Sequence, residues 1–232
     1  MGGSRNLNVR LYKEFKMNKY LIIIITIIAF GLRYSQIDRY LWVDEAISAF
    51  NVQKWDIPQK EIIPYYIAKA TGSVTRQGLR LPFVLISSLS VLAIYFVVED
   101  KRNALIIAVY VAILPLYSYW GSMARPYCIG AFFAILGYRW PVFYIPAVLT
   151  TPLAITAINI WKIKTRWFYY LIIIVAALLY FKSMPLGGAD HLNSLEHLIH
   201  AKRFWYIPTI GILLNLGDFN LDRLQGLFRI SK

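Results

Sequence analysis

Long runs of hydrophobic residues with few polar interruptions dominate this chain. Three of them, residues 21–32 (LIIIITIIAFGL), 81–98 (LPFVLISSLSVLAIYFVV) and 169–181 (YYLIIIVAALLYF), contain no charged side chain. Continuous apolar stretches approaching 20 residues match the length of an α-helix that crosses a bilayer, and they lack the alternation typical of half-buried strands. The pattern therefore predicts an all-α, polytopic membrane protein.

The pattern divides the chain into about seven or eight membrane runs. We expect them at residues 20–33, 79–98, 103–119, 124–138, 140–161, 167–182 and 204–216. Pro146 and Pro152 interrupt the fifth of these runs. Two half-length helices that meet near Thr150 and Thr151 would return the basic stretch that follows, residues 161–166, to the cytoplasm. A single simple span is the alternative.

Basic residues set the expected topology. Lysines and arginines precede the first run, and loops rich in these residues stay on the cytoplasmic side. We expect one transmembrane domain, residues 1–232, with a cytoplasmic N-terminus. Its polar segments are a cytoplasmic basic tail (1–19), an exterior loop with short amphipathic helices at the membrane surface (34–78), a second exterior loop (183–203) and a cytoplasmic tail (217–232).

The net charge and the cysteine content exclude several classes of partner and site. The net charge of +13 would suggest a nucleic-acid partner in a soluble protein. Here the basic residues lie between apolar runs, so membrane topology and anionic lipid explain them, and no nucleic acid is expected. The single cysteine, Cys128, excludes intrachain disulfides and cysteine-based metal clusters. Its place in an apolar run favours packing over the alternative, the nucleophile of a membrane transpeptidase.

The expected exterior face gathers side chains that can carry chemistry from distant parts of the chain. They are Asp44, Glu45, Glu61, Arg80, Arg125, Tyr127, His191, His197, His200, Lys202 and Arg203. Carboxylates, histidines and arginines on one surface are what a site acting on a phosphorylated lipid needs.

The adjacent carboxylates Asp44 and Glu45 point about 100° apart if they lie on a helix, so they serve different purposes. One can face a cleft as a general base while the other caps or pairs. The alternative is a helix N-terminus that simply favours acidic residues. Arg80 and Arg125 can bind phosphate bidentately, or can extend to lipid headgroups.

Four short motifs resemble the GT-C superfamily of integral-membrane glycosyltransferases, in particular protein mannosyltransferases and aminoarabinose transferase-like enzymes, in a short form. In chain order they are LWVDEAISAF (41–50), EIIPYYIAKATG (61–72), LRLPF (79–83) and SMARPYCIGAF (122–132). Their order and spacing agree with that family over roughly residues 20–160.

The resemblance implies transfer of a sugar, with inversion, from a polyprenyl-phosphate-linked donor to a lipid, glycan or protein acceptor. The reaction would take place on the exterior face of a prokaryotic cytoplasmic (inner) membrane. Asp44 would be the general base and Glu45 a supporting residue. Arg80 and Arg125 would steady the site or the carrier phosphate, where fixed cations help as charge develops.

The resemblance also implies further binding residues. The expected substrate-binding set is Trp42, Tyr65, Tyr66, Arg80, Arg125, Tyr127, Lys202 and Arg203, and a divalent metal ion would be held by Glu61 and His191. By their own chemistry, the aromatic members of this set can stack on sugar rings or isoprenoid, or can belong to the aromatic belt of a membrane interface. The chain is shorter than these relatives and lacks their His-Pro-Pro motif. The alternative is therefore a non-catalytic or partner-dependent subunit that binds polyprenyl-phosphate lipid.

Overall fold

The computed structural model describes residues 3–41, 45–46, 66–67, 69–70, 75–159, 167, 170–172, 174–175, 178 and 206–217, with only the backbone given for 3–17, 152 and 153. These residues form helices, and no strand occurs among them. The elements are α1 (Gly3–Tyr34), α4 (Arg76–Val97), α5 (Lys101–Ile113), α6 (Pro115–Gly121), α7 (Pro126–Arg139), η1 (Pro141–Phe143), α8 (Tyr144–Thr150), η2 (Pro152–Ala157) and α12 (Tyr206–Gly217). The all-α prediction is confirmed for this part of the chain.

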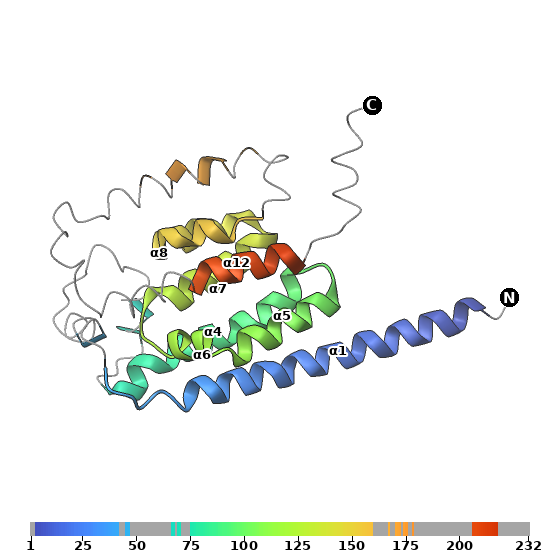
Figure 1. Ribbon diagram of the computed structural model, residues 1–232, viewed down its shortest axis with the longest axis horizontal. Helices are drawn as coiled ribbons and strands as arrows, with labels where there is room; N and C mark the ends of the chain where they lie inside the picture. Colours follow the sequence, from blue (N-terminus) through green and yellow to red (C-terminus); the bar gives the residue numbers. More distant parts are fainter. Residues whose placement is uncertain are drawn as a thin grey trace.

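The helices pack into one bundle with α1 along its edge (Figure 1). Helix α1 contacts α4 and α5, α4 also packs on α7, and α12 lies against α7 and η2. A helix of 32 residues is about 48 Å long, and the N-terminal part of α1 extends beyond the other helices. The helix was expected to begin near residue 20, but no proline interrupts the segment before it, and the basic tail continues as helix.

Among the described residues, one or two candidate helices are both long and apolar enough to cross a membrane. Helix α4 is long and apolar enough to cross a membrane, and α5 with α6 would make a second candidate if the bent pair were one span. Helix α12 and the segment Pro141–Thr150 are apolar but shorter. Most of the run expected at 167–182 lies outside the described residues. The larger number of membrane runs therefore remains a prediction.

The connection between α4 and α5 is a short charged turn that contains Glu99 and Asp100. Asp100 caps α5, and its carboxylate accepts hydrogen bonds from the backbone N–H groups of Arg102 and Asn103 at 2.8 and 3.3 Å. Lys101 Nζ donates to the carbonyls of Tyr95 and Val98, both at 2.8 Å, near the end of α4. These contacts reverse the chain and return α5 alongside α4.

The third run, expected as one helix over residues 103–119, is broken. Helices α5 and α6 meet at Leu114 with a bend of 65°. Pro115 causes the break because it has no N–H to donate to Val111 O and its ring crowds the preceding turn. Instead, Arg33 Nη2 of α1 donates to Val111 O at 3.0 Å. The arginine therefore satisfies the carbonyl group that the proline leaves without a partner.

The segment after α7 turns back on itself, as the two prolines indicated. Helix α8 ends at Thr150, and η2 begins at Pro152. Tyr144 OH at the start of α8 donates to Ala157 O at the end of η2, at 2.6 Å. The chain therefore reverses at Thr151 within a short hairpin, although its second half is a 3-10 helix instead of the expected α-helix.

Helix α12 sits unusually close to the backbone of η2. A Cβ atom at Gly211 would overlap Thr156 O and would lie 2.7 Å from Ala157 Cα. Asn215 Nδ2, one turn later, donates to Ile158 O at 3.1 Å. Only glycine permits this approach, because the neighbouring atoms belong to backbone and cannot rotate away.

Gly211→Ala is therefore expected to push α12 off η2 and to lower the free energy of unfolding by about 1–3 kcal/mol. Unfolding of the purified protein in mixed micelles, followed by circular dichroism during an SDS titration, measures this change. Gly31→Ala in α1 is the matched control, since nothing lies within 4 Å of a Cβ atom there. The control should be neutral or stabilising by up to about 1 kcal/mol, because alanine favours helix over glycine. Equal costs for the two variants would contradict the close approach.

Candidate functional site

A buried carboxylate joins three of the sequence motifs at one end of the bundle. Glu45 Oε1 accepts hydrogen bonds from Arg80 Nε at 2.9 Å and from the backbone N–H of Ala124 at 2.8 Å, and Glu45 Oε2 pairs with Arg80 Nη2 at 2.5 Å. The side chains of Glu45 and Arg80 are 0% and 2% exposed. We call Glu45, Arg80 and Ala124 the Glu45 cluster. Its members come from the motifs LWVDEAISAF, LRLPF and SMARPYCIGAF, so the expected convergence of these three motifs is present.

Local structure places Arg80 in this cluster. Thr75 is the N-cap of α4, and its hydroxyl oxygen accepts from the backbone N–H of Gly78 at 3.1 Å. Arg80 lies one turn into the helix and points back over the helix N-terminus, as long side chains on helices do. It therefore reaches the segment that follows α1.

All five N–H groups of Arg80 are engaged by the protein. Besides Glu45, they donate to the carbonyls of Ile37, Arg39 and Tyr40 at 3.1, 2.8 and 3.1 Å. The guanidinium thereby holds the chain after α1 in place and has no donor left for a phosphate. Of the two roles expected for Arg80, the geometry fits steadying the site and does not fit binding the carrier phosphate.

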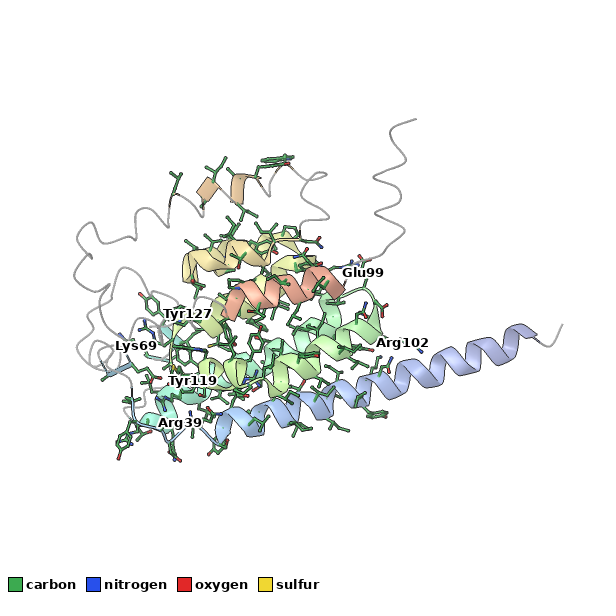
Figure 2. All side chains as sticks on the ribbon, in the orientation of Figure 1. Arg39, Lys69, Glu99, Arg102, Tyr119 and Tyr127 are labelled. Atoms are coloured by element: carbon green, nitrogen blue, oxygen red, sulfur yellow. The ribbon has the colours of Figure 1, made fainter. Side chains whose placement is uncertain are left out.

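A pocket of about 540 Å³ opens beside the Glu45 cluster. It lies between the turn after α1, the start of α4 and the end of α6, at the end of the bundle where Figure 2 labels Arg39 and Tyr119. Its walls are Gln36, Asp38, Arg39, Tyr40, Arg76, Arg80, Tyr119, Ser122 and Met123. We call it the arginine pocket. Its volume suits a ligand of drug or sugar size.

The electrostatics of the arginine pocket are positive. Glu45 neutralises Arg80, and two further guanidinium groups face a single wall carboxylate, Asp38. Arg39 lies 5.5 Å from the ring centroid of Tyr119, and Arg76 lies 5.1 Å from that of Tyr40. Asp38 Oδ1 accepts from Gln77 Nε2 at 2.7 Å. Two arginines held against aromatic rings are suited to bind an anionic group.

Arg125 and Tyr127 lie at the same end but outside the walls of the arginine pocket. Arg125 is half-buried at the N-cap of α7, and Pro126 is the first residue of that helix. The Arg125 guanidinium is 6.0 Å from the Tyr127 ring centroid. The Trp120 and Tyr127 rings meet edge to face with centroids 6.0 Å apart. Cys128 is fully buried in a cluster with Leu79, Phe83 and Ile129, a position suited to packing.

Of the remaining candidate site residues, the structure describes Tyr66 but not the others. Tyr66 is 53% exposed. The expected residues Trp42, Asp44, Glu61, Tyr65, His191, His197, His200, Lys202 and Arg203 lie outside the described residues. Among the described residues no group of three metal-binding side chains occurs. The metal expected at Glu61 and His191 therefore stays a prediction.

Sequence reasoning missed most of the pocket wall, including Gln36, Arg39 and Arg76. The sequence could have indicated Arg76, because Arg76 and Arg80 are four residues apart and share a helix face. Arg39 directly precedes Tyr40 and the LWVDEAISAF motif, but nothing in the spacing marks it as facing a pocket. Comparison with protein-family models, curated proteins and solved structures found no match for this chain.

Proposed function

We propose that the protein is a membrane glycosyltransferase of GT-C-like architecture. It would take a sugar from a polyprenyl-phosphate-linked donor and transfer it to a lipid, glycan or protein acceptor at the exterior face of a prokaryotic cytoplasmic membrane. The chain would cross the bilayer through its apolar runs, with the N-terminus in the cytoplasm. A divalent metal ion at Glu61 and His191 remains part of the proposal.

One observation carries this proposal. The Glu45 cluster links three of the resemblance motifs by hydrogen bonds, and it does so next to a cationic, aromatic pocket at one end of apolar helices. A phosphate group leaving a sugar needs fixed positive charge, and aromatic faces suit sugar rings or isoprenoid. Lys101, Arg102 and Arg139 lie at the opposite end of the bundle, and basic loops favour the cytoplasmic side, which agrees with an exterior site.

In the proposed reaction, Asp44 acts as the general base. Its carboxylate takes the proton from the acceptor hydroxyl or amine as that atom attacks the anomeric carbon. The bond from this carbon to the phosphate oxygen breaks, the configuration inverts, and the polyprenyl phosphate leaves with its electron pair. Glu45 is bound to Arg80 and Ala124, so it would hold the neighbouring Asp44 in place without reacting itself.

The second candidate is a non-catalytic or partner-dependent subunit that binds polyprenyl-phosphate lipid. The observation that favours it is the complete engagement of Arg80 by the protein. Two residues that the resemblance places in an active site, Glu45 and Arg80, stabilise the fold here. A protein that kept these contacts for stability alone would show the same geometry.

Transfer of radiolabelled sugar tests the proposal. Purified protein in lipid is given a panel of synthetic polyprenyl-phosphate sugars, with and without divalent metal ions. Wild type should move label to an acceptor or to water, and Asp44→Asn should reduce transfer to background, because an amide cannot accept the proton. Glu99→Gln is the matched control, since Glu99 is an exposed carboxylate at the other end of the bundle (Figure 2). Donor binding without transfer by wild type would favour the non-catalytic subunit instead.

A further inference from the structure

The buried guanidinium of Arg33 ties three helices together. Arg33 is fully buried, and among the described residues no carboxylate pairs with it. Its Nη1 donates to Ala29 O within α1 at 3.0 Å. Its Nε donates to Ser87 Oγ of α4 at 2.7 Å, and its Nη2 donates to Val111 O of α5 at 3.0 Å. Burial of a charge without a carboxylate partner is costly, and an apolar side chain would fill the space without that cost. What the guanidinium adds is a planar fork that donates to α1, α4 and α5 in one fixed geometry.

The same side chain also contacts α6, on the other side of the break at Pro115. Gly121 is the last residue of α6, and a Cβ atom there would lie 2.8 Å from Arg33 Nε and 3.0 Å from Ser87 Cβ. A larger residue at this position would have to displace the Arg33–Ser87 pair or move the end of α6. Arg33 therefore holds both arms of the bend, the last turn of α5 through Val111 O and the end of α6 through Gly121.

The position of α6 determines part of the arginine pocket. Tyr119, Ser122 and Met123 line the pocket, and Arg39 lies 5.5 Å from the Tyr119 ring centroid (Figure 2). Helix α6 has 7 residues and is about 10 Å long, so a change of about 20° in the bend would move its end by about 3 Å. A shift of that size would take the Tyr119 ring away from the Arg39 guanidinium, which it helps to hold in place.

We infer that Arg33 is a positioning residue for the arginine pocket. By holding Val111 O and the end of α6 together, it fixes the angle between α5 and α6 and thereby the place of Tyr119 beside Arg39. Arg33 does not touch the ligand, because its side chain is fully buried and does not line the pocket. This inference deepens the proposed function, and it rests on that function only for the use of the pocket as an anion site.

Pyrophosphate binding separates the positioning role from stability. Inorganic pyrophosphate is titrated by calorimetry against the full chain in phosphatidylcholine nanodiscs. In the double variant Arg33→Ala/Pro115→Ala, the alanine at position 115 can donate to Val111 O, which recovers stability but continues α5 towards α6 and relaxes the bend. This variant should bind pyrophosphate at least tenfold more weakly than wild type. Equal affinity would overturn the inference, and so would the absence of binding by wild type.

Two single variants separate the angle from the proline and from the charge. Pro115→Ala alone is the matched control, because Arg33 still holds both arms, and its affinity should stay within about twofold of wild type. A tenfold loss in this variant would assign the angle to the proline. Arg33→Lys keeps the positive charge without the planar fork, so it should bind as weakly as the double variant. Wild-type affinity in Arg33→Lys would mean that the charge alone attracts the anion. Either of these two results would overturn the role of Arg33.

Gly121→Ala gives a second test that leaves Arg33 in place. The added methyl group should push the end of α6 away from the Arg33–Ser87 pair and weaken pyrophosphate binding at least fivefold. Gly31→Ala is the matched control and should bind like wild type, since nothing lies within 4 Å of a Cβ atom there. Equal affinities of the two glycine variants would show that the pocket does not depend on the place of α6.

Arg39→Gln checks that pyrophosphate occupies the arginine pocket. It should weaken binding about tenfold or more, because it removes a charge-assisted hydrogen bond, and an unchanged affinity would overturn the inference. Sugar transfer is not needed for any of these measurements. The expected affinities without sugar transfer by wild type would uphold the role of Arg33 while removing the proposed function. Transfer by wild type, with pyrophosphate affinity that does not depend on Arg33, would do the reverse.

Discussion

Glu45→Ala should lower the free energy of unfolding by about 3–5 kcal/mol, because it leaves the buried Arg80 charge without its carboxylate. The loss also removes the acceptor for the backbone N–H of Ala124, which ties the start of α7 to the start of α4. Unfolding by SDS titration in mixed micelles measures the change. Loss of folded protein on expression would be consistent with the upper end of this range.

Glu99→Ala is the matched control for this prediction. Glu99 also pairs with an arginine, Arg139, at 2.8 Å, but both side chains are more than 40% exposed. An exposed pair contributes about 0–1 kcal/mol because water and salt screen it. A similar cost for the two alanine variants would show that the Glu45 cluster does not hold the fold together. Arg80→Lys should behave like Glu45→Ala, since an ammonium group cannot supply five N–H donors in a plane.

Arg33→Ala is expected to cost about 2–4 kcal/mol. The Arg33 side chain is fully buried, and its Nε donates to Ser87 Oγ at 2.7 Å while Nη2 donates to Val111 O at 3.0 Å. Its removal leaves the carbonyl at the helix break unpaired and opens a cavity next to Gly121, where Arg33 Nε lies 2.8 Å from the Cβ position. The same SDS titration reports the loss.

Pro115→Ala tests whether Arg33 stabilises the protein through the carbonyl of Val111. In the Arg33→Ala background, an alanine at position 115 provides the N–H that can reach Val111 O, so it should recover about 1–2 kcal/mol. In wild type the carbonyl already has the arginine as its donor, so the same substitution should gain less. Equal effects of Pro115→Ala in the two backgrounds would mean that Arg33 does not act through the broken helix.

The burial of Arg33 could not be predicted from the sequence. An arginine at the end of an apolar run is typical of a side chain that extends to the membrane surface. Its burial depends on a carbonyl that Pro115 leaves without a donor and that comes into reach only after the helices pack. Nothing in the sequence relates Arg33 to Pro115, which lie 82 positions apart, so it could not indicate that one compensates for the other.

In the candidate site too, local sequence predicted some features, and tertiary packing determines the others. Local signals predicted the chain reversal at Thr151, because proline acts on its own neighbours. Glu45 and Arg80 were expected on the same face of the protein, but neither their ion pair nor the number of carbonyl groups around Arg80 was expected. That number depends on the path of residues 37–40, which is set by tertiary packing. The wall residues Gln36 and Arg39 belong to this same path.

The place of α12 in the bundle has a consequence for biosynthesis. The Asn103 side chain donates to Gly217 O and the Tyr138 hydroxyl to Leu214 O, contacts that join residues 114 and 76 positions apart. The Glu45 cluster, in contrast, is complete once Ala124 has been made. At typical translation rates, the interval between these two events is on the order of ten seconds. The end of the bundle with the arginine pocket can therefore form before α12 has been synthesised and can pack against η2 and α7.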